Sequence, residues 1–397
     1  MKIITSALCI FTTVQEKFDY TIIGAGAAGT LLAYEMTKNP FFSQKRILIL
    51  DRGDDQRLDR TWSYWERGDG ELDHLLLHEW SQFEVAFKQK RYLHRMHPYR
   101  YKTIEGAAFH HYFDAEFLKH KNILIRHEEV QDCVENELGV AIHCQSKNVY
   151  QSAFVFDSRF NYPELKSQTK YPVLQQHFIG WFVETEEDVF DELTPKFMDF
   201  TVEQRGNTRF MYVLPFSKNK ALVEYTLFSA EPLAKKEYED EIVSYLKEMT
   251  SAPYKVIQME SGNIPMCCYP LWKKTTSKIM PIGMAGGWTK ASTGYTFKSS
   301  QEKAKELALF LTQEKDLKDF YSAGKFWIYD MLLLDILYRS NEKGAAIFTS
   351  LFKRRKAPLI LKFLEEKTSF AEDVMVMAAP RPWPFIKALL GRVFSGF

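Results

Sequence analysis

A glycine-rich turn constrains the possible fold of this chain more than any other feature. Gly24, Gly26 and Gly29 follow a mostly apolar stretch at residues 20–23 and open a stretch whose apolar residues have helical spacing. In a strand–turn–helix unit, Gly24 allows the tight turn, Gly26 lets the backbone approach a pyrophosphate, and Gly29 lets the helix pack closely on the strand. The first amides of such a helix point at the phosphates.

A second predicted strand supports this interpretation. Residues 46–50 are expected to form a strand that ends on Asp51. Asp51 follows Gly29 by about 20 residues, where dinucleotide-binding folds place the acid that binds a ribose. The pattern predicts a dinucleotide-binding enzyme, and a strand–turn–helix unit without a ligand is the alternative.

Size and charge narrow the class of protein further. A chain of 397 residues is long for one hydrophobic core, which predicts about two domains. The net charge of +1 gives no overall field that would recruit nucleic acid.

The five cysteines show no CxxC pair and no zinc spacing, which fits a reducing cytoplasm. The histidine pairs His94/His97 and His110/His111 lack cysteine or acidic partners, so we expect no metal site.

The aromatic content is high, with 31 Phe, 20 Tyr and 8 Trp. These side chains can form an aromatic core, or they can line a site for a large apolar or cationic species. Residues 1–17 contain a short apolar run and no usual export cleavage site. We therefore interpret them as a disordered extension, or as residues that precede the true start of the protein. No stretch reaches the ~18 uninterrupted apolar residues of a membrane span.

The predicted elements suggest a discontinuous nucleotide-binding domain. It would comprise residues 18–80, 105–160 and 276–325. Within it we expect a helix at 114–121, strands at 122–126, 130–134, 139–144, 153–156 and 278–282, and a helix at 293–311.

A sheet domain is predicted to be inserted in that domain, from residues 81–104 and 161–275. Its expected strands are 83–87, 92–93, 177–184, 197–204, 209–214, 221–228 and 254–260, with one helix at 236–250. Residues 326–397 are expected to be a mostly helical C-terminal region, without repeats or low-complexity tracts.

Several sequence strings, in order along the chain, together resemble the flavin-dependent lycopene cyclases of carotenoid synthesis. Besides the glycine turn, they are Asp59-Arg60-Thr61-Trp62-Ser63-Tyr64-Trp65 and residues 176–181, 198–200, 212–215, 222–226, 262–266, 286–295 and 326–337. The resemblance extends from residue 18 to about residue 390. It implies a glutathione-reductase-type α/β fold that binds FAD, with an inserted, mostly antiparallel sheet for the substrate.

The resemblance also implies a reaction without net redox. A proton is added at C2 of an acyclic ψ end of lycopene, the neighbouring double bond closes the ring, and loss of the C6 proton gives a β-ionone ring. Reduced FAD, with NADPH as its electron donor, would stabilise the carbocation. The implied partners are lycopene and other carotenoids with ψ ends, not nucleic acid.

Glu224 lies where the family has its essential carboxylate. In a strand, Leu222, Glu224, Thr226 and Phe228 share one face, because side chains alternate with period two. A carboxyl among apolar neighbours can stay protonated at pH 7 and deliver a proton to an alkene. The alternative is an exposed strand glutamate.

A second glycine segment is the predicted flavin partner of the first. It contains Gly283, Gly286, Gly287, Thr293 and Gly294, and the expected helix from Thr293 would direct its amides at the flavin. Many flavoproteins have Asp after the first of these glycines, where this chain has Met284, a departure that lycopene cyclases share. A loop that merely turns is the alternative.

Aromatic side chains follow the second predicted strand. We expect Arg60 and Thr61 to lie near the flavin, and Trp62, Tyr64 and Trp65 either to line a tunnel for the polyene or to belong to the core.

The C-terminal region mixes cationic and bulky apolar residues, as in the run 353–356 and in residues 381–390. This composition is typical of a segment that lies on anionic lipid, although a packed helix with a solvated basic edge has it too. A forty-carbon hydrocarbon must be drawn from a bilayer, so we expect a cytoplasmic enzyme, peripheral on the inner face of the membrane. The alternative functions are a hydroxylase or isoprenoid reductase of the same fold, and a non-catalytic isoprenoid-binding protein.

Overall fold

The computed structural model describes residues 16–53 and 60–395 and has two large sheets. The first sheet has the order β8-β2-β1-β11-β10-β9, with β17 paired to β11. Its members are β1 (Lys17–Ile23), β2 (Ile47–Asp51), β8 (Ile123–His127), β9 (Val130–Asn136), β10 (Gly139–Cys144), β11 (Val149–Asp157) and β17 (Ile279–Pro281). The strands β8, β2, β1, β11 and β17 are parallel, and β9 and β10 add an antiparallel edge.

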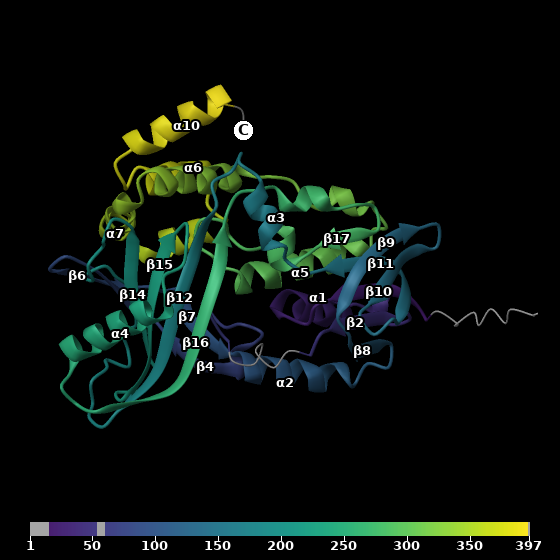
Figure 1. Ribbon diagram of the computed structural model, residues 1–397, viewed down its shortest axis with the longest axis horizontal. Helices are drawn as coiled ribbons and strands as arrows, with labels where there is room; N and C mark the ends of the chain where they lie inside the picture. The colour runs from purple at the N-terminus through teal and green to yellow at the C-terminus, as the bar shows by residue number, and fades with distance from the viewer. Residues whose placement is uncertain (1–15, 54–59, 396–397) are drawn as a thin grey trace, which may run out of the picture.

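Three helices cover one face of the parallel strands (Figure 1), and a core of buried residues lies between the helices and the sheet. They are α1 (Ala27–Lys38), α2 (Gly106–Phe117) and α5 (Phe297–Leu311). The helix α1 packs on both α2 and α5. The parallel strand–helix–strand arrangement is a Rossmann fold, as the sequence predicted.

The second sheet is mostly antiparallel and has the order β16-β12-β15-β14-β13-β5-β6. Its strands are β5 (Gln82–Phe87), β6 (Lys90–Arg95), β12 (Leu174–Thr185), β13 (Lys196–Asp199), β14 (Thr208–Pro215), β15 (Lys220–Ser229) and β16 (Tyr254–Met266). The helix α4 (Lys235–Met249) covers one face, where it packs on alternate residues of β15 such as Val223, Tyr225 and Leu227. The intervening residues of β15 therefore point to the opposite face.

A third, small sheet joins segments from both predicted domains. It contains β3 (Thr61–Arg67), β7 (Tyr99–Glu105) and β4 (Leu76–Trp80), in the order β3-β7-β4. The strands β3 and β4 belong to the predicted segment 18–80, whereas most of β7 belongs to the predicted segment 81–104. Since β7 pairs with both β3 and β4, the predicted boundaries at residues 80/81 and 104/105 divide this sheet. The division into domains itself stays a prediction.

The C-terminal region is helical, as predicted. It contains α6 (Lys325–Arg339), α7 (Gly344–Arg354), α8 (Ala357–Leu364), α9 (Phe370–Met377) and α10 (Trp383–Ser395). The short helix α3 (Tyr162–Ser167) lies before β12 in the chain. Figure 1 shows α10 on the outer side of α6. The Arg392 guanidinium donates to both carboxylate oxygens of Asp335 at 2.7 Å and fastens α10 to α6. None of the helices in the described residues has the length and apolar character needed to cross a membrane.

Several predicted boundaries differ from the structure. Helix 114–121 is α2, which starts at Gly106 because the aromatic residues Phe109, Phe113 and Phe117 bury one of its faces. Strand 197–204 ends at Asp199, whose carboxylate accepts the Thr201 amide and starts a turn. The strand predicted at 254–260 continues to Met266 along β12. Of the predicted extension 1–17, residues 1–15 lie outside the described residues, and Lys17 already belongs to β1.

Candidate functional site

The first glycine turn has the close contacts that its sequence predicted. Gly24 has a φ of +92°, and a Cβ atom on Gly29 would lie 2.0 Å from the Gly24 carbonyl oxygen. A Cβ on Gly26, the N-cap of α1, would meet no atom within 4 Å among residues 16–53 and 60–395, and no side chain in these ranges caps the helix. The end of α1 is therefore accessible to an anion.

Asp51 lies beside this turn. Its Oδ2 accepts the Ala25 amide at 2.7 Å, and its Oδ1 accepts the Gly53 amide at 2.9 Å. These bonds hold the carboxylate at the carboxyl end of β2. A carboxylate in this position can accept ribose hydroxyls.

The second glycine segment lies directly against the first. Gly283 has a φ of +58°, and a Cβ on it would lie 2.8 Å from the Ala28 Cβ in α1. A Cβ on Gly286 would lie 2.2 Å from the Pro281 carbonyl oxygen, and Gly287 has a φ of +74°. Two segments about 250 positions apart thus meet because glycine leaves room for them.

Thr293 and Gly294 lie in a loop before α5, not at its start. The helix begins at Phe297, so the predicted start at Thr293 was wrong by four residues. Gly294 has a φ of +70°, a conformation that favours a loop over a helix. The Thr293 hydroxyl is fully buried without a hydrogen-bond partner in the described part of the chain, and so is Oε1 of Gln176.

These features fit a bound flavin nucleotide. The uncapped end of α1 suits its phosphates, and Asp51 suits its ribose. The buried Thr293 hydroxyl without a partner offers a hydrogen bond to a polar edge of a ring.

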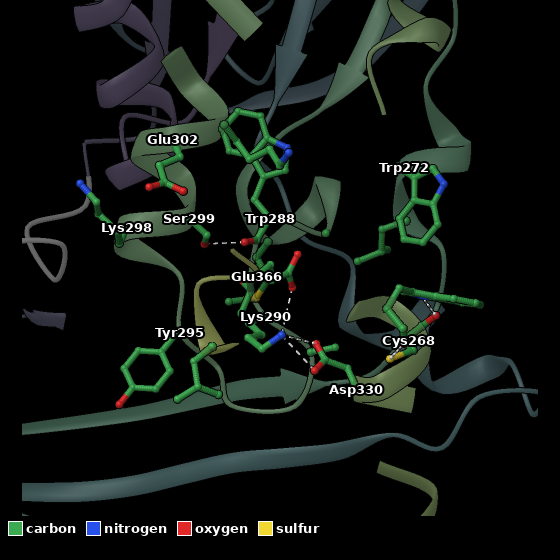
Figure 2. A pocket seen from close by; sticks show the side chains of 18 of the residues that line it. Cys268, Trp272, Trp288, Lys290, Tyr295, Lys298, Ser299, Glu302, Asp330 and Glu366 are labelled. Atoms are coloured by element: carbon green, nitrogen blue, oxygen red, sulfur yellow. Dashed lines mark hydrogen bonds and ion pairs between the residues drawn. The ribbon is translucent and has the colours of Figure 1, made fainter. Parts of the chain in front are cut away.

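A cavity of about 350 Å³, here called the lysine cavity, lies beside the second glycine segment. Figure 2 shows the Lys290 ammonium between two carboxylates, and it lies 3.0 Å from both Asp330 and Glu366. Burial opposes the charge of Lys290, but the two carboxylates outweigh this effect and raise its pKa. The Ser292 hydroxyl also donates to Asp330 at 2.7 Å. Lys290, Ser292 and Asp330 are buried, Glu366 is exposed, and together they tie the segment before α5 to the C-terminal helices.

A second cavity of about 240 Å³, here called the carboxyl cavity, lies on the face of the second sheet opposite α4. Tyr295 and Phe297 line both cavities and lie between them. The carboxyl cavity is mostly apolar, and its aromatic lining comprises Trp62, Tyr101, Phe178, Phe197, Phe210, Tyr212, Phe228, Tyr295, Phe297, Phe348 and Phe352.

Glu224 points into the carboxyl cavity from β15. The residue is only 7% exposed, and Leu222 and Phe228 of the same strand line the cavity with it. Burial and then the charge of Glu260 raise the pKa of Glu224 to about 8, against a hydrogen bond from Thr226 to its Oε1. The structure excludes the alternative of an exposed strand glutamate, and Glu224 remains our candidate proton donor.

A second glutamate in this cavity, Glu260, was not predicted. It is half-buried on β16, and the Thr61 hydroxyl lies 2.9 and 3.2 Å from its two oxygens. Burial raises the pKa of Glu260 to about 7, and hydrogen bonding by Thr61 limits the increase. Glu260 ends a predicted strand just before the motif at 262–266, but only the strand pairing shows that it lies near Glu224.

The other predicted residues of this region are divided between the two cavities. Trp62 lines the carboxyl cavity, whereas Tyr64 and Trp65 line the lysine cavity. Arg60 is exposed at the start of β3, and its carbonyl accepts the Gly106 amide at 2.6 Å. Asp59 lies outside the described residues.

Comparison with known proteins agrees with this geometry. The family model described as "Lycopene cyclase protein" matches residues 19–390. This chain belongs to the lycopene cyclase family. One curated relative is "Lycopene beta-cyclase" of Paracoccus sp. Its sequence is 24% identical to this chain, over 94% of this chain and 96% of the relative.

The family's Rossmann fold is also seen in solved structures at low sequence identity. A geranylgeranyl bacteriochlorophyll reductase-like protein from Thermoplasma acidophilum is similar with a TM-score of 0.62 at 12% identity, over 94% of this chain and 98% of that one. A flavoprotein/dehydrogenase from Cytophaga hutchinsonii is similar with a TM-score of 0.60 at 12% identity, over 95% and 100%. These likenesses confirm the fold class predicted from the sequence.

Proposed function

We propose that this protein is a lycopene β-cyclase, which converts the acyclic ψ ends of lycopene into β-ionone rings without net oxidation or reduction. The observation that carries the proposal is Glu224, a buried carboxyl whose pKa of about 8 keeps it protonated at neutral pH. Family membership and the relative named lycopene beta-cyclase support the choice of substrate.

Glu224 is the group that starts the reaction. Its Oε1 accepts the Thr226 hydroxyl, which leaves Oε2 to carry the acid proton into the cavity. Transfer of this proton to C2 of the ψ end leaves a cation at C1, which the neighbouring double bond attacks to close the ring. Loss of the C6 proton then gives the β ring.

The cavity lining supports a carbocation reaction. Aromatic rings surround Glu224 and exclude water that would otherwise capture the cation. Their faces attract positive charge by cation–π interactions, which are stronger when both groups are desolvated.

The proposal includes FAD as the cofactor, with the reduced form active and NADPH as its electron donor. When bound, reduced flavin supplies negative charge that stabilises the carbocation. Gly24, Gly26 and Gly29 would hold its pyrophosphate with Gly283, Gly286 and Gly287. Asp51 would hold its ribose, Thr293 and Gly294 would hold the polar edge of its ring, and Arg60 and Thr61 would flank it.

We also propose that the enzyme acts on the cytoplasmic surface of the membrane. Trp383, Ile386, Leu390, Val393 and Phe394 are exposed on α10. Exposed apolar side chains of this kind usually mark an interaction surface. Of the basic run at residues 353–356, Arg354 and Arg355 donate to carbonyls of Ala379 and Met375, so the apolar face of α10 is the main candidate for membrane contact.

The test measures how many hydrogen and deuterium atoms the product contains, by mass spectrometry. The full-length protein with reduced FAD, given lycopene in vesicles in D₂O, should release a product isomeric with lycopene that carries one deuterium per ring at the C2-derived position. A product with fewer double bonds would indicate a reductase, and a product with added oxygen would indicate a hydroxylase. Unchanged lycopene would indicate a binding protein.

A further inference from the structure

Gly180 on β12 lies between two glutamates in the second sheet. It is paired with Glu224 on β15 and with Glu260 on β16. Residues paired across neighbouring strands point to the same face of a sheet. Glu224 and Glu260 therefore face the carboxyl cavity from both sides of a residue that has no side chain.

The missing side chain leaves room for the two carboxyls to approach each other. A Cβ on Gly180 would lie 3.4 Å from the Glu224 Cβ and 3.4 Å from the Glu260 Cγ, and 2.8 Å from the Leu222 Cδ1. The two glutamates are two strand spacings apart, or about 10 Å between backbones. Any larger residue at position 180 would fill the space through which their side chains converge.

The groups around the two carboxyls cannot neutralise two negative charges. Among the described residues that line the cavity there is no Lys, Arg or His. The other ionisable groups are the hydroxyls of Tyr101 on β7, Tyr212 on β14 and Tyr295 in the loop before α5, and burial raises the pKa of each. Two carboxylates without a nearby cation repel each other, which favours one shared proton.

The hydrogen bonds give the two carboxyls different roles. Thr61 donates to Glu260 and stabilises its ionised form. Glu224 is the more deeply buried of the two and keeps the proton.

We propose that Glu224 and Glu260 act as a carboxyl pair that holds one proton, with Glu224 as the acid for C2 and Glu260 as the base for C6. The inference rests on the proposed function and extends it, because it assigns the proton acceptor. The two positions are close together in the cyclised cation, since C2 and C6 are both bonded to C1 once the ring has closed.

The steps balance. The Glu224 O–H bond breaks as the electrons of the C1=C2 double bond form the C2–H bond and leave a cation at C1. The electrons of the C5=C6 bond then form the C1–C6 bond and leave a cation at C5. The C6–H bond then breaks, its electrons form the new C5=C6 bond, and the proton passes to a Glu260 oxygen. That proton exchanges with water between turnovers, and a proton returns to Glu224, which restores the pair without any co-reactant.

The test compares Glu260→Gln with the wild-type protein over a range of pH. The wild-type rate should be bell-shaped, falling below about pH 7 as Glu260 takes up a proton and above about pH 8 as Glu224 loses its own. In Glu260→Gln the rate should drop by ~10²–10⁴-fold, the acidic limb should vanish, and the alkaline limb should move to lower pH because the charge that holds the Glu224 proton is gone.

A second readout needs no turnover. The infrared carbonyl band of protonated Glu224 should disappear at lower pH in Glu260→Gln than in the wild-type protein. Glu184→Gln is the matched control, because Glu184 lies on β12 but pairs with Lys220 at the surface. If Glu260→Gln does not fold, Thr61→Val keeps both carboxyls and should move the acidic limb to higher pH.

The outcomes separate this inference from the proposed function. A wild-type pH profile and an unshifted infrared band in Glu260→Gln would overturn the pair while leaving the cyclase intact. A wild-type protein that does not cyclise lycopene would overturn the proposed function, and the infrared shift would still decide whether the carboxyls share a proton.

Discussion

A protonated glutamate at position 224 has opposite effects on activity and on stability. The aromatic cavity that keeps the proton on Glu224 provides an acid at neutral pH. The same environment destabilises the folded state at any pH at which a glutamate exposed to water would be ionised. Removing the acid should therefore affect the two properties in opposite directions.

The first prediction concerns activity. Glu224→Gln keeps the size of the side chain but removes its acid proton, so ring closure should fall by ~10²–10⁴-fold or more. Product analysis of bacteria that accumulate lycopene, expressing either form, would measure this. FAD content should be unchanged, and a variant with near-normal activity would contradict the assignment of Glu224.

The second prediction concerns stability. Between pH 4.5, where glutamate ordinarily ionises, and about pH 8, folded Glu224 holds a proton that the unfolded chain has lost. Stability should therefore fall as pH rises through this window. Glu224→Gln should show a weaker decline and a higher Tm than the wild-type protein at pH 8. Thermal unfolding of both proteins and of Glu184→Gln at pH 5 and pH 8 would measure this, and equal slopes would contradict it.

At the scale of single residues, the sequence predicted the role of Glu224 but did not indicate that Glu260 lies near it. Period two along β15 was enough to place Glu224 on a face with Leu222 and Phe228. The position of Glu260 depends on the pairing of β16 with β12, and of β12 with β15. Pairing between distant strands leaves no periodic signal in either strand.

At the scale of elements, α10 is unusual because one side is fastened and the other is exposed. Arg392 is ion-paired with Asp335, and Ala388 packs on Leu332 and Ile336 of α6. The opposite side presents large apolar residues. A helix held in this way can offer its apolar face to a lipid surface without leaving the protein.

The third prediction tests this face. Ile386→Asp combined with Leu390→Asp should weaken binding to anionic vesicles by more than tenfold, because each buried side chain of this size contributes ~1.5 kcal/mol or more. Flotation of full-length protein would measure binding. Leu118→Asp is the control, since Leu118 is 85% exposed at the end of α2. Unchanged flotation of the double variant would exclude α10 as the contact.

Boundaries of elements were harder to predict than the elements themselves. The start of α2 depends on aromatic residues that face α1, and the start of α5 depends on the left-handed conformation of Gly294. Tertiary packing decides both, so local spacing could indicate the helices but not where they begin.

At the scale of the whole molecule, the proposed nucleotide site is formed where segments from the two ends of the Rossmann domain meet. Gly283 lies against Ala28, and only the absence of a side chain allows this contact. The glycines themselves were visible in the sequence. The contact between the two segments was implied by the family resemblance and not by their spacing.

The fourth prediction follows from this contact. Gly283→Val would place a Cβ 2.8 Å from the Ala28 Cβ at a φ of +58°, so FAD affinity should fall by about tenfold or more, as a strain of ~1–2 kcal/mol implies. Flavin fluorescence during titration would measure it. Gly324→Ala is the control, since a Cβ there meets no atom within 4 Å. Equal affinity in both variants would contradict the site.

The carboxyl cavity, at about 240 Å³, is small beside a forty-carbon substrate. Sites that enclose a whole drug-sized ligand usually measure roughly 300–1,000 Å³. In the proposed cyclase, one end group would be held at Glu224 and the rest of the polyene would extend outside. Each molecule would then have to leave, turn end for end and bind again before a second ring could close. The one-ringed carotenoid would be a free species that other enzymes could intercept, and the ratio of one-ringed to two-ringed products would depend on how quickly it re-enters.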